Sequence, residues 1–143
     1  LQNYRMTNYV FDLDRFSAFE GKTGPYLQYQ GVRIKSLLRK AAEAGNQPGT
    51  TIVIELPEER VLALALDAFN NAVHLAFDKR APNFIADHVY TLAGAFSSLY
   101  GAAPLAAEAD PAKRASRLAL AALTLKQLEV GLSLLGIEIP ARM

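Results

Sequence analysis

Aromatic, amide and basic side chains recur along one stretch of the sequence at helical spacing. Tyr26, Tyr29, Gln30 and Arg33 are spaced at i, i+3, i+4 and i+7, and Lys40 follows seven residues after Arg33. Residues at this spacing share one face of an α-helix. Because tyrosine rings stack on bases and cations contact phosphates, such a face suits unpaired nucleotides. The same spacing also fits a tyrosine pair that is half-buried against a neighbouring helix.

Positive charge is concentrated although the formal net charge is only +1. Residues 22–42 and 111–126 together hold nine of the fifteen lysines and arginines and contain no aspartate or glutamate. Charge separated in this way can form a basic face on a nearly neutral protein.

Other kinds of chemistry find little support in the sequence. Cysteine is absent, two histidines are too few for a histidine metal cage, and there is no glycine-rich phosphate loop. Asp12 and Asp14 could bind magnesium, but they are better placed to cap a helix. His74 and His88 are expected at the surface or its boundary. No apolar run approaches the ~18 residues of a membrane span, and no signal peptide is evident, so we expect a fragment of a soluble cytoplasmic protein.

The elements that must position these side chains are helices. Alanine (24) and leucine (21) far outnumber valine and isoleucine, which favours helix over sheet. Capping residues, first-turn prolines and apolar stripes predict a short helix from Asp12 or Asp14 through Phe19, followed by longer ones. These begin near residue 23, at Pro57 (to about residue 79, with a break near Asn70-Asn71), at Pro82 and at Asp110-Pro111, the last being largely buried and ending at Gly136. Residues 51–54 are expected to be extended linker. The predicted fold is an all-α bundle of four to six mostly antiparallel helices.

Several sequence strings have a specific resemblance. The run Phe11-Asp12-Leu13-Asp14-Arg15-Phe16, the string EGKTGPYLQY at residues 20–29 and Arg33 closely resemble the arginyl-tRNA synthetase family. The second half agrees through residues 90–100, Arg114 to Leu118, residues 135–138 and the closing Arg142-Met143. These motifs span nearly the whole chain in order. The resemblance implies the C-terminal anticodon-binding domain named for its DALR signature.

The resemblance also implies a function and a set of contacts. Residues 1–24 would connect to a missing catalytic domain, and residues 25–143 would bind the anticodon stem-loop of tRNA(Arg). Its candidate tRNA-binding residues are Tyr26, Tyr29 and Tyr100 as stacking platforms, Gln30 and Arg33 as polar contacts, and Met143 through its carboxylate or backbone. Lys35, Lys40, Lys113, Arg114 and Arg117 are candidate phosphate contacts. The full-length enzyme would use ATP and magnesium, whereas this fragment should need no cofactor and be inactive alone.

The sequence departs from the family at some positions and leaves rival functions open. Position 113 is lysine where the DALR signature has leucine, and Gln30-Gly31 replace a common Ala-His pair. The HIGH and KMSK motifs of the catalytic domain are absent. One alternative is a helical protein-interaction or structural bundle, which would show no salt-dependent RNA binding. Another is the same module from a different class I synthetase.

Overall fold

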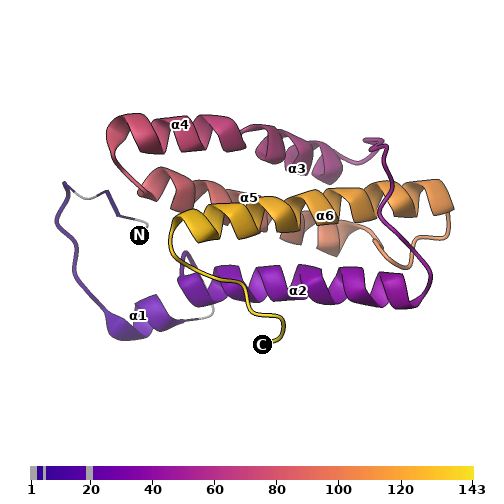
Figure 1. Ribbon diagram of the computed structural model, residues 1–143, viewed down its shortest axis with the longest axis horizontal. Helices are drawn as coiled ribbons and strands as arrows, with labels where there is room; N and C mark the ends of the chain where they lie inside the picture. The colour runs from indigo at the N-terminus through magenta and orange to yellow at the C-terminus, as the bar shows by residue number, and fades with distance from the viewer. Residues whose placement is uncertain (1–2, 5, 19–20) are drawn as a thin grey trace.

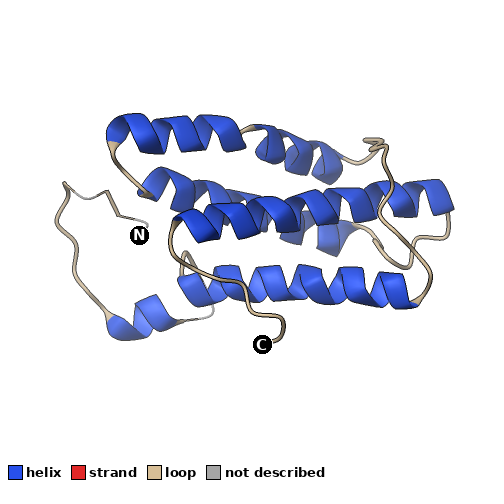
Figure 2. Ribbon diagram, viewed as in Figure 1, coloured by secondary structure: helices blue, strands red, loops and turns tan. Residues whose placement is uncertain are grey.

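The chain forms an antiparallel helical bundle. The computed structural model describes residues 3–4, 6–18 and 21–143, with the backbone alone at residues 15 and 16. The helices are α1 (Leu13–Ser17), α2 (Gly24–Glu43), α3 (Pro57–Asp67), α4 (Phe69–Lys79), α5 (Asn83–Ala102) and α6 (Pro111–Leu134). In Figure 1, α2 and α5 run in one direction and α3, α4 and α6 in the other, with α3 and α4 forming one long side. Figure 2 shows no strand in the described part of the chain, so the all-α prediction is confirmed.

Local side-chain chemistry sets the ends of the two longest helices. The Thr23 hydroxyl accepts a hydrogen bond from the backbone N–H of Tyr26 at 3.2 Å, and Pro25 occupies the first turn of α2. Asp110 accepts from the N–H groups of Ala112 (2.8 Å) and Lys113 (3.3 Å) at the start of α6. Both side chains satisfy donors that have no partner within the helix. These helix starts were predicted correctly.

The observed boundaries differ from the expected ones in two places. The break after α3 falls at Ala68, before Asn70-Asn71, and this bend places the Phe69 ring against His88, with ring centroids 5.5 Å apart. The first helix ends at Ser17, whose hydroxyl donates to the Leu13 carbonyl, so the predicted continuation through Ala18 was wrong. Phe19 lies outside the described residues. Residues 51–54 form neither helix nor strand, which is compatible with the expected linker.

The core lies where α5 and α6 meet α2 and α3. Its fully buried side chains include Ile34, Leu62, Val89, Leu92, Phe96, Leu99, Leu118, Leu128 and Leu132. Each large apolar side chain removed from water contributes about 1.5–3 kcal/mol. The expectation that α6 is largely buried was wrong on one side. Leu123, Val130 and Leu134 are about half exposed because α6 packs on α2, α3 and α5 and leaves its remaining face open.

His88 was expected near the surface, but the structure buries it in α5. Burial disfavours the charged imidazolium and so lowers the pKa of His88, and the nearby Gln127 side chain offsets this only in part. His74 is exposed, as expected. Within the described residues, no helix has both the length and the apolar character required to cross a membrane.

Candidate nucleic-acid interface

A surface hollow of about 300 Å³ brings together five of the predicted contact residues. It is lined by Tyr29, Val32, Arg33, Ser36, Leu37, Lys40, Tyr100 and Met143. Tyr29 and Tyr100 are 47% and 37% exposed as residues, and the Arg33 guanidinium carbon lies 3.9 Å from the centre of the Tyr100 ring. The hollow therefore presents two aromatic side chains and two cations to solvent, with Met143 beside them.

Two parallel helices position these side chains. Tyr29, Arg33, Ser36 and Lys40 follow one another at helical spacing on α2, while Leu27, Ile34 and Ala41 are buried on another side of the same helix. Tyr100 belongs to the last turns of α5, where its ring packs on Phe96 with centroids 6.0 Å apart. The packed core of α5 therefore fixes the base of the tyrosine and leaves part of its ring in the hollow.

Tyr26 and Gln30 were predicted on the same face, but the structure places them in the contact between α2 and α5. The Tyr26 ring lies 5.7 Å from the Tyr90 ring and is half-buried. The Gln30 side chain is 4% exposed, and its carbonyl accepts a hydrogen bond from the Ser97 hydroxyl at 3.2 Å. Gln30 lies about 100° round the helix from Tyr29, so Tyr29 faces solvent while Gln30 faces α5. Neither lines the hollow.

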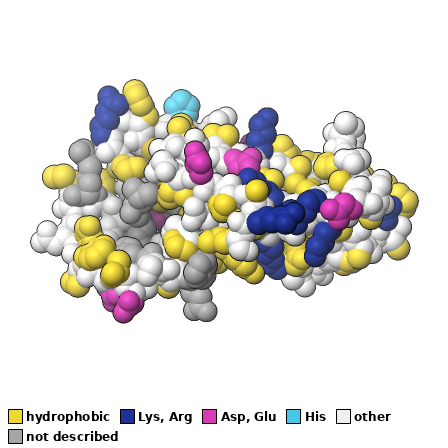
Figure 3. Space-filling view, turned by 60° about the horizontal axis from the view of Figure 1, so that its bottom comes forward, with side chains coloured by type: hydrophobic (Ala, Val, Ile, Leu, Met, Phe, Trp, Pro, Cys, Tyr) yellow, Lys and Arg dark blue, Asp and Glu magenta, His cyan; other side chains and the backbone are white. Residues whose placement is uncertain are grey.

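Positive charge accompanies the hollow. Arg33, Lys35, Arg39 and Lys40 follow within eight residues of α2, and Lys40 is exposed at the edge of the hollow. Figure 3 shows Lys and Arg side chains gathered on this face of the molecule. Lys35, however, is committed elsewhere, because its ammonium group donates to the Ile139 carbonyl at 3.0 Å and pairs with Glu129 at 2.9 Å.

Arg117 is not a surface cation, which corrects its assignment as a phosphate contact. Its side chain is 6% exposed and forms ion pairs with Glu59, at 2.8 Å, and with Glu108. Burial alone would raise the pKa of Glu59, but hydrogen bonds from the Glu55 N–H, Arg117 and the Leu56 N–H outweigh it and lower that pKa. A cation held between two carboxylates is not available to RNA.

The neighbouring cations at the start of α6 are also engaged. Arg114 donates from Nη1 to the Glu108 carbonyl at 2.6 Å, and Lys113 pairs with Glu55 at 2.7 Å. Neither lines the hollow. Position 113, where the DALR signature has leucine, thus carries an exposed lysine that forms an ion pair.

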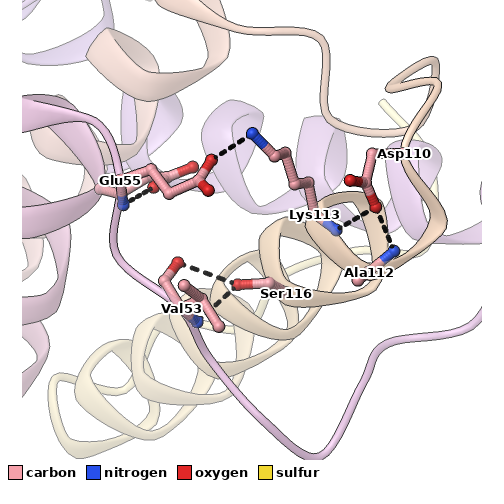
Figure 4. Close-up of a pocket in the computed structure, with 7 residues that line it drawn as sticks. Val53, Glu55, Asp110, Ala112, Lys113 and Ser116 are labelled. Atoms are coloured by element: carbon pink, nitrogen blue, oxygen red, sulfur yellow. Dashed lines mark hydrogen bonds and ion pairs between the residues drawn. The ribbon is translucent and has the colours of Figure 1, made fainter.

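A second, smaller pocket of about 170 Å³ lies beside Lys113 (Figure 4). The Ser116 hydroxyl accepts from the Val53 N–H at 2.9 Å and lies 3.2 Å from the Val53 carbonyl, to which it donates. These bonds, with the Lys113–Glu55 pair, fasten the extended segment before α3 to the start of α6 (Figure 4). This contact could not be predicted from the sequence, because its partners are 58 or more residues apart. We assign the pocket a structural role.

Metal-ligating clusters are not found in the part of the chain that the structure describes. No group of three or more His, Cys, Asp or Glu side chains is placed to hold an ion there. The polar groups of the hollow are instead a guanidinium, an ammonium, two phenols and a hydroxyl. Such groups bind and orient a ligand, and they offer no paired acid and base for catalysis.

Comparisons with known proteins identify the family to which the chain belongs. The model of the DALR anticodon binding domain matches residues 27–143. The chain is 62% identical to the arginine–tRNA ligase of Maricaulis maris and 59% identical to that of Hyphomonas neptunium, over all 143 of its residues and 24% of each relative. It therefore spans about a quarter of the length of these relatives.

Solved structures show the same fold. The arginyl-tRNA synthetase of Thermus thermophilus superposes with a TM-score of 0.78 and 35% identity, covering 88% of this chain and 22% of that one. The synthetase of Plasmodium falciparum gives a TM-score of 0.83 over 99% of this chain and 25% of that one, at 22% identity, a likeness of fold alone. A family match over most of the chain, relatives that align along its whole length and a shared helical fold lead to one conclusion: this chain belongs to the DALR anticodon-binding domain family of arginyl-tRNA synthetases.

Proposed function

We propose that this chain binds the anticodon stem-loop of tRNA(Arg) as one module of an arginine–tRNA ligase. The relatives carry that name, and the chain spans about a quarter of their length. The joining of arginine to tRNA, with ATP and magnesium, would belong to the part of the enzyme beyond these residues. Residues 1–24 would connect the module to the catalytic domain of the same polypeptide. Like its tRNA substrate, the enzyme would be cytoplasmic.

The observation that carries the proposal is the hollow itself. Two partly exposed tyrosines, a guanidinium on one of them and a lysine at the rim lie around about 300 Å³ of open space. Stacking of a base on an aromatic ring is worth about 1–3 kcal/mol and tolerates any base. The cations would contact phosphates on either side of the stacked nucleotides. Because the guanidinium of Arg33 already covers part of Tyr100, Tyr29 is the more accessible platform.

Selectivity requires a different kind of contact. Arginine anticodons have cytosine in the middle, and an unpaired cytosine offers an amino donor on its pairing edge. A main-chain carbonyl at Met143 would accept from this amino group without placing an acidic side chain near phosphates. Met143 lines the hollow with both tyrosines, which supports this role.

Arg114 remains a proposed phosphate contact outside the hollow, whereas Tyr26 and Gln30 have structural positions.

The salt dependence of binding tests this assignment. Each lysine that neutralises a phosphate should lower the slope of log affinity against log salt by about 0.7–0.9 when it is removed. We expect this change for Lys40→Ala with an arginine-anticodon stem-loop. Lys126→Ala is the matched control, since Lys126 is an exposed lysine on α6 away from the hollow. Equal slopes for both variants would refute the proposed interface, and absence of salt-dependent binding would favour a protein-interaction module.

A further inference from the structure

The segment after α6 returns across α2 and ends at the hollow. Gly136, at φ +75°, closes α6, and the N–H groups of Gly136 and Ile137 bond to the carbonyls of Ser133 (3.0 Å) and Leu132 (2.9 Å). A left-handed glycine with these two bonds turns the chain sharply away from the helix axis. In Figure 1 the segment then passes over α2. We call residues 137–143 the tail.

The tail follows one stripe of α2. The Gln28 amide donates to the Glu138 carbonyl at 2.8 Å, and the Lys35 ammonium donates to the Ile139 carbonyl at 3.0 Å. Gly31 comes three residues after Gln28 and four residues before Lys35, so the three residues share one face of α2. Lys35 also pairs with Glu129 of α6 at 2.9 Å, so it joins the tail to both helices.

Gly31 is a socket for Ile139. A Cβ atom at position 31 would lie 2.5 Å from Cδ1 and 2.7 Å from Cγ2 of Ile139, against about 3.5–4.0 Å for an ordinary contact between carbons. Glycine in the interior of a helix is unfavourable relative to alanine. Its presence in the middle of α2 is explained by the close approach of the tail.

The socket controls how far Met143 can move. When Ile139 is held in place, the four residues after it allow Met143 to lie at most ~14 Å from Ile139. If the tail were free from Gly136 onward, Met143 could lie about 25 Å from Gly136. Gly31, Lys35 and Ile139 do not line the hollow, but Met143 does. We propose that Gly31 and Lys35 are positioning residues that hold Met143 at the anticodon hollow, and that selection of the middle base depends on them. This inference rests on the proposed function.

The test is Gly31→Ala, which adds only the methyl group that the socket excludes. Gly94→Ala is its matched control, because Gly94 lies inside α5 with no atom within 4 Å of a Cβ there. Both variants gain the same helix propensity, so a difference between them reports the contact with Ile139. The double variant Gly31→Ala/Ile139→Ala makes room for the added methyl and keeps both hydrogen bonds to the tail backbone.

Two measurements are needed. The chain has two methionines, Met6 and Met143, so methyl-¹³C labelling gives two NMR signals that report the tail without RNA. Affinities for stem-loops with cytosine or uracil in the middle of the anticodon give the discrimination ratio. In Gly31→Ala we expect the Met143 signal to move toward that of Met6, which is the more exposed of the two (73% against 59%). We expect the discrimination ratio to fall roughly two- to tenfold, as for the loss of one hydrogen bond. Gly94→Ala should match the unaltered chain, and the double variant should recover most of the ratio.

The outcomes separate this inference from the proposed function. A displaced Met143 signal with an unchanged ratio would show that the tail does not select the base and would overturn the inference alone. An unmoved Met143 signal with an unchanged ratio would show that Gly31 does not hold the tail, and it would also overturn the inference alone. If the unaltered chain bound neither stem-loop, the proposed function and the inference would both fall.

Discussion

Replacing Arg117 by methionine should weaken the fold and leave RNA recognition by the folded chain unchanged. Methionine keeps much of the apolar stem but removes the cation from between two carboxylates. Glu59, only 2% exposed, then loses its main counter-charge. Breaking a buried ion pair by removing one partner costs about 3–5 kcal/mol. We expect about 3 kcal/mol, the lower end, because Glu59 keeps hydrogen bonds from the N–H groups of Glu55 (2.8 Å) and Leu56 (3.0 Å).

Urea unfolding followed by far-ultraviolet circular dichroism at pH 7 measures this loss. The double variant Glu59→Gln/Arg117→Met should recover most of it, since no unpaired charge remains buried. The lowered pKa of Glu59 means that its ionised form stabilises the fold above its ordinary value of 4.5. This contribution is lost as the pH falls through the folded-state pKa of Glu59. The difference in free energy of unfolding between Arg117→Met and the unaltered chain should therefore become smaller in acid.

Two results would contradict a buried, structural Arg117. A loss below about 1 kcal/mol would place the pair among surface ion pairs, in conflict with its burial. A lower salt slope for RNA binding by folded Arg117→Met would return Arg117 to the set of phosphate contacts. Lys113→Ala, which breaks an exposed pair in the same region, is the matched control and should unfold like the unaltered chain.

Three further predictions concern single residues. Tyr29→Ala should cost about 1–3 kcal/mol of stem-loop binding and Tyr29→Phe much less, measured by titration; an unfolded Tyr29→Ala chain would contradict the exposed position of this ring. Burial lowers the pKa of His88, so below pH 6.5, its ordinary pKa, the unfolded state binds more protons and the free energy of unfolding should fall. Urea unfolding at pH 7.5 and 5.5 should show a smaller fall for His88→Phe than for the unaltered chain. An equal fall in both would mean that other groups cause the pH dependence. Arg80 ends α4 at φ +50°, so Arg80→Gly should raise the melting temperature by relieving about 1 kcal/mol of backbone strain, whereas a lower one would show that its contact with the Phe77 ring matters more.

Local patterns were sufficient to predict most of the fold. Thr23 and Asp110 cap helices through bonds to residues two or three positions ahead, so the sequence contains the whole interaction. The buried stripe of α5 follows in the same way from its 3.6-residue period. Exposure of α6 could not be predicted, because it depends on how many neighbours the bundle supplies to that helix.

The candidate site was predicted less completely, for the same physical reason. Tyr29, Arg33 and Lys40 share a face, which spacing reveals, but spacing does not show that Gln30 faces Ser97 of another helix. Arg117 lies in a segment without acids, and its partner Glu59 is 58 residues away. Gly31 did carry a signal, a glycine in the middle of a strong helix, but the residue that fills the space could be found only in three dimensions.

If this chain reads an arginine anticodon, its affinity must depend on the middle base. Two stem-loops would differ only in the middle base of the anticodon, cytosine in one and uracil in the other, at a single salt concentration. The hollow formed by Tyr29, Tyr100 and Met143 predicts tighter binding of the cytosine stem-loop. Equal affinities would contradict the claim.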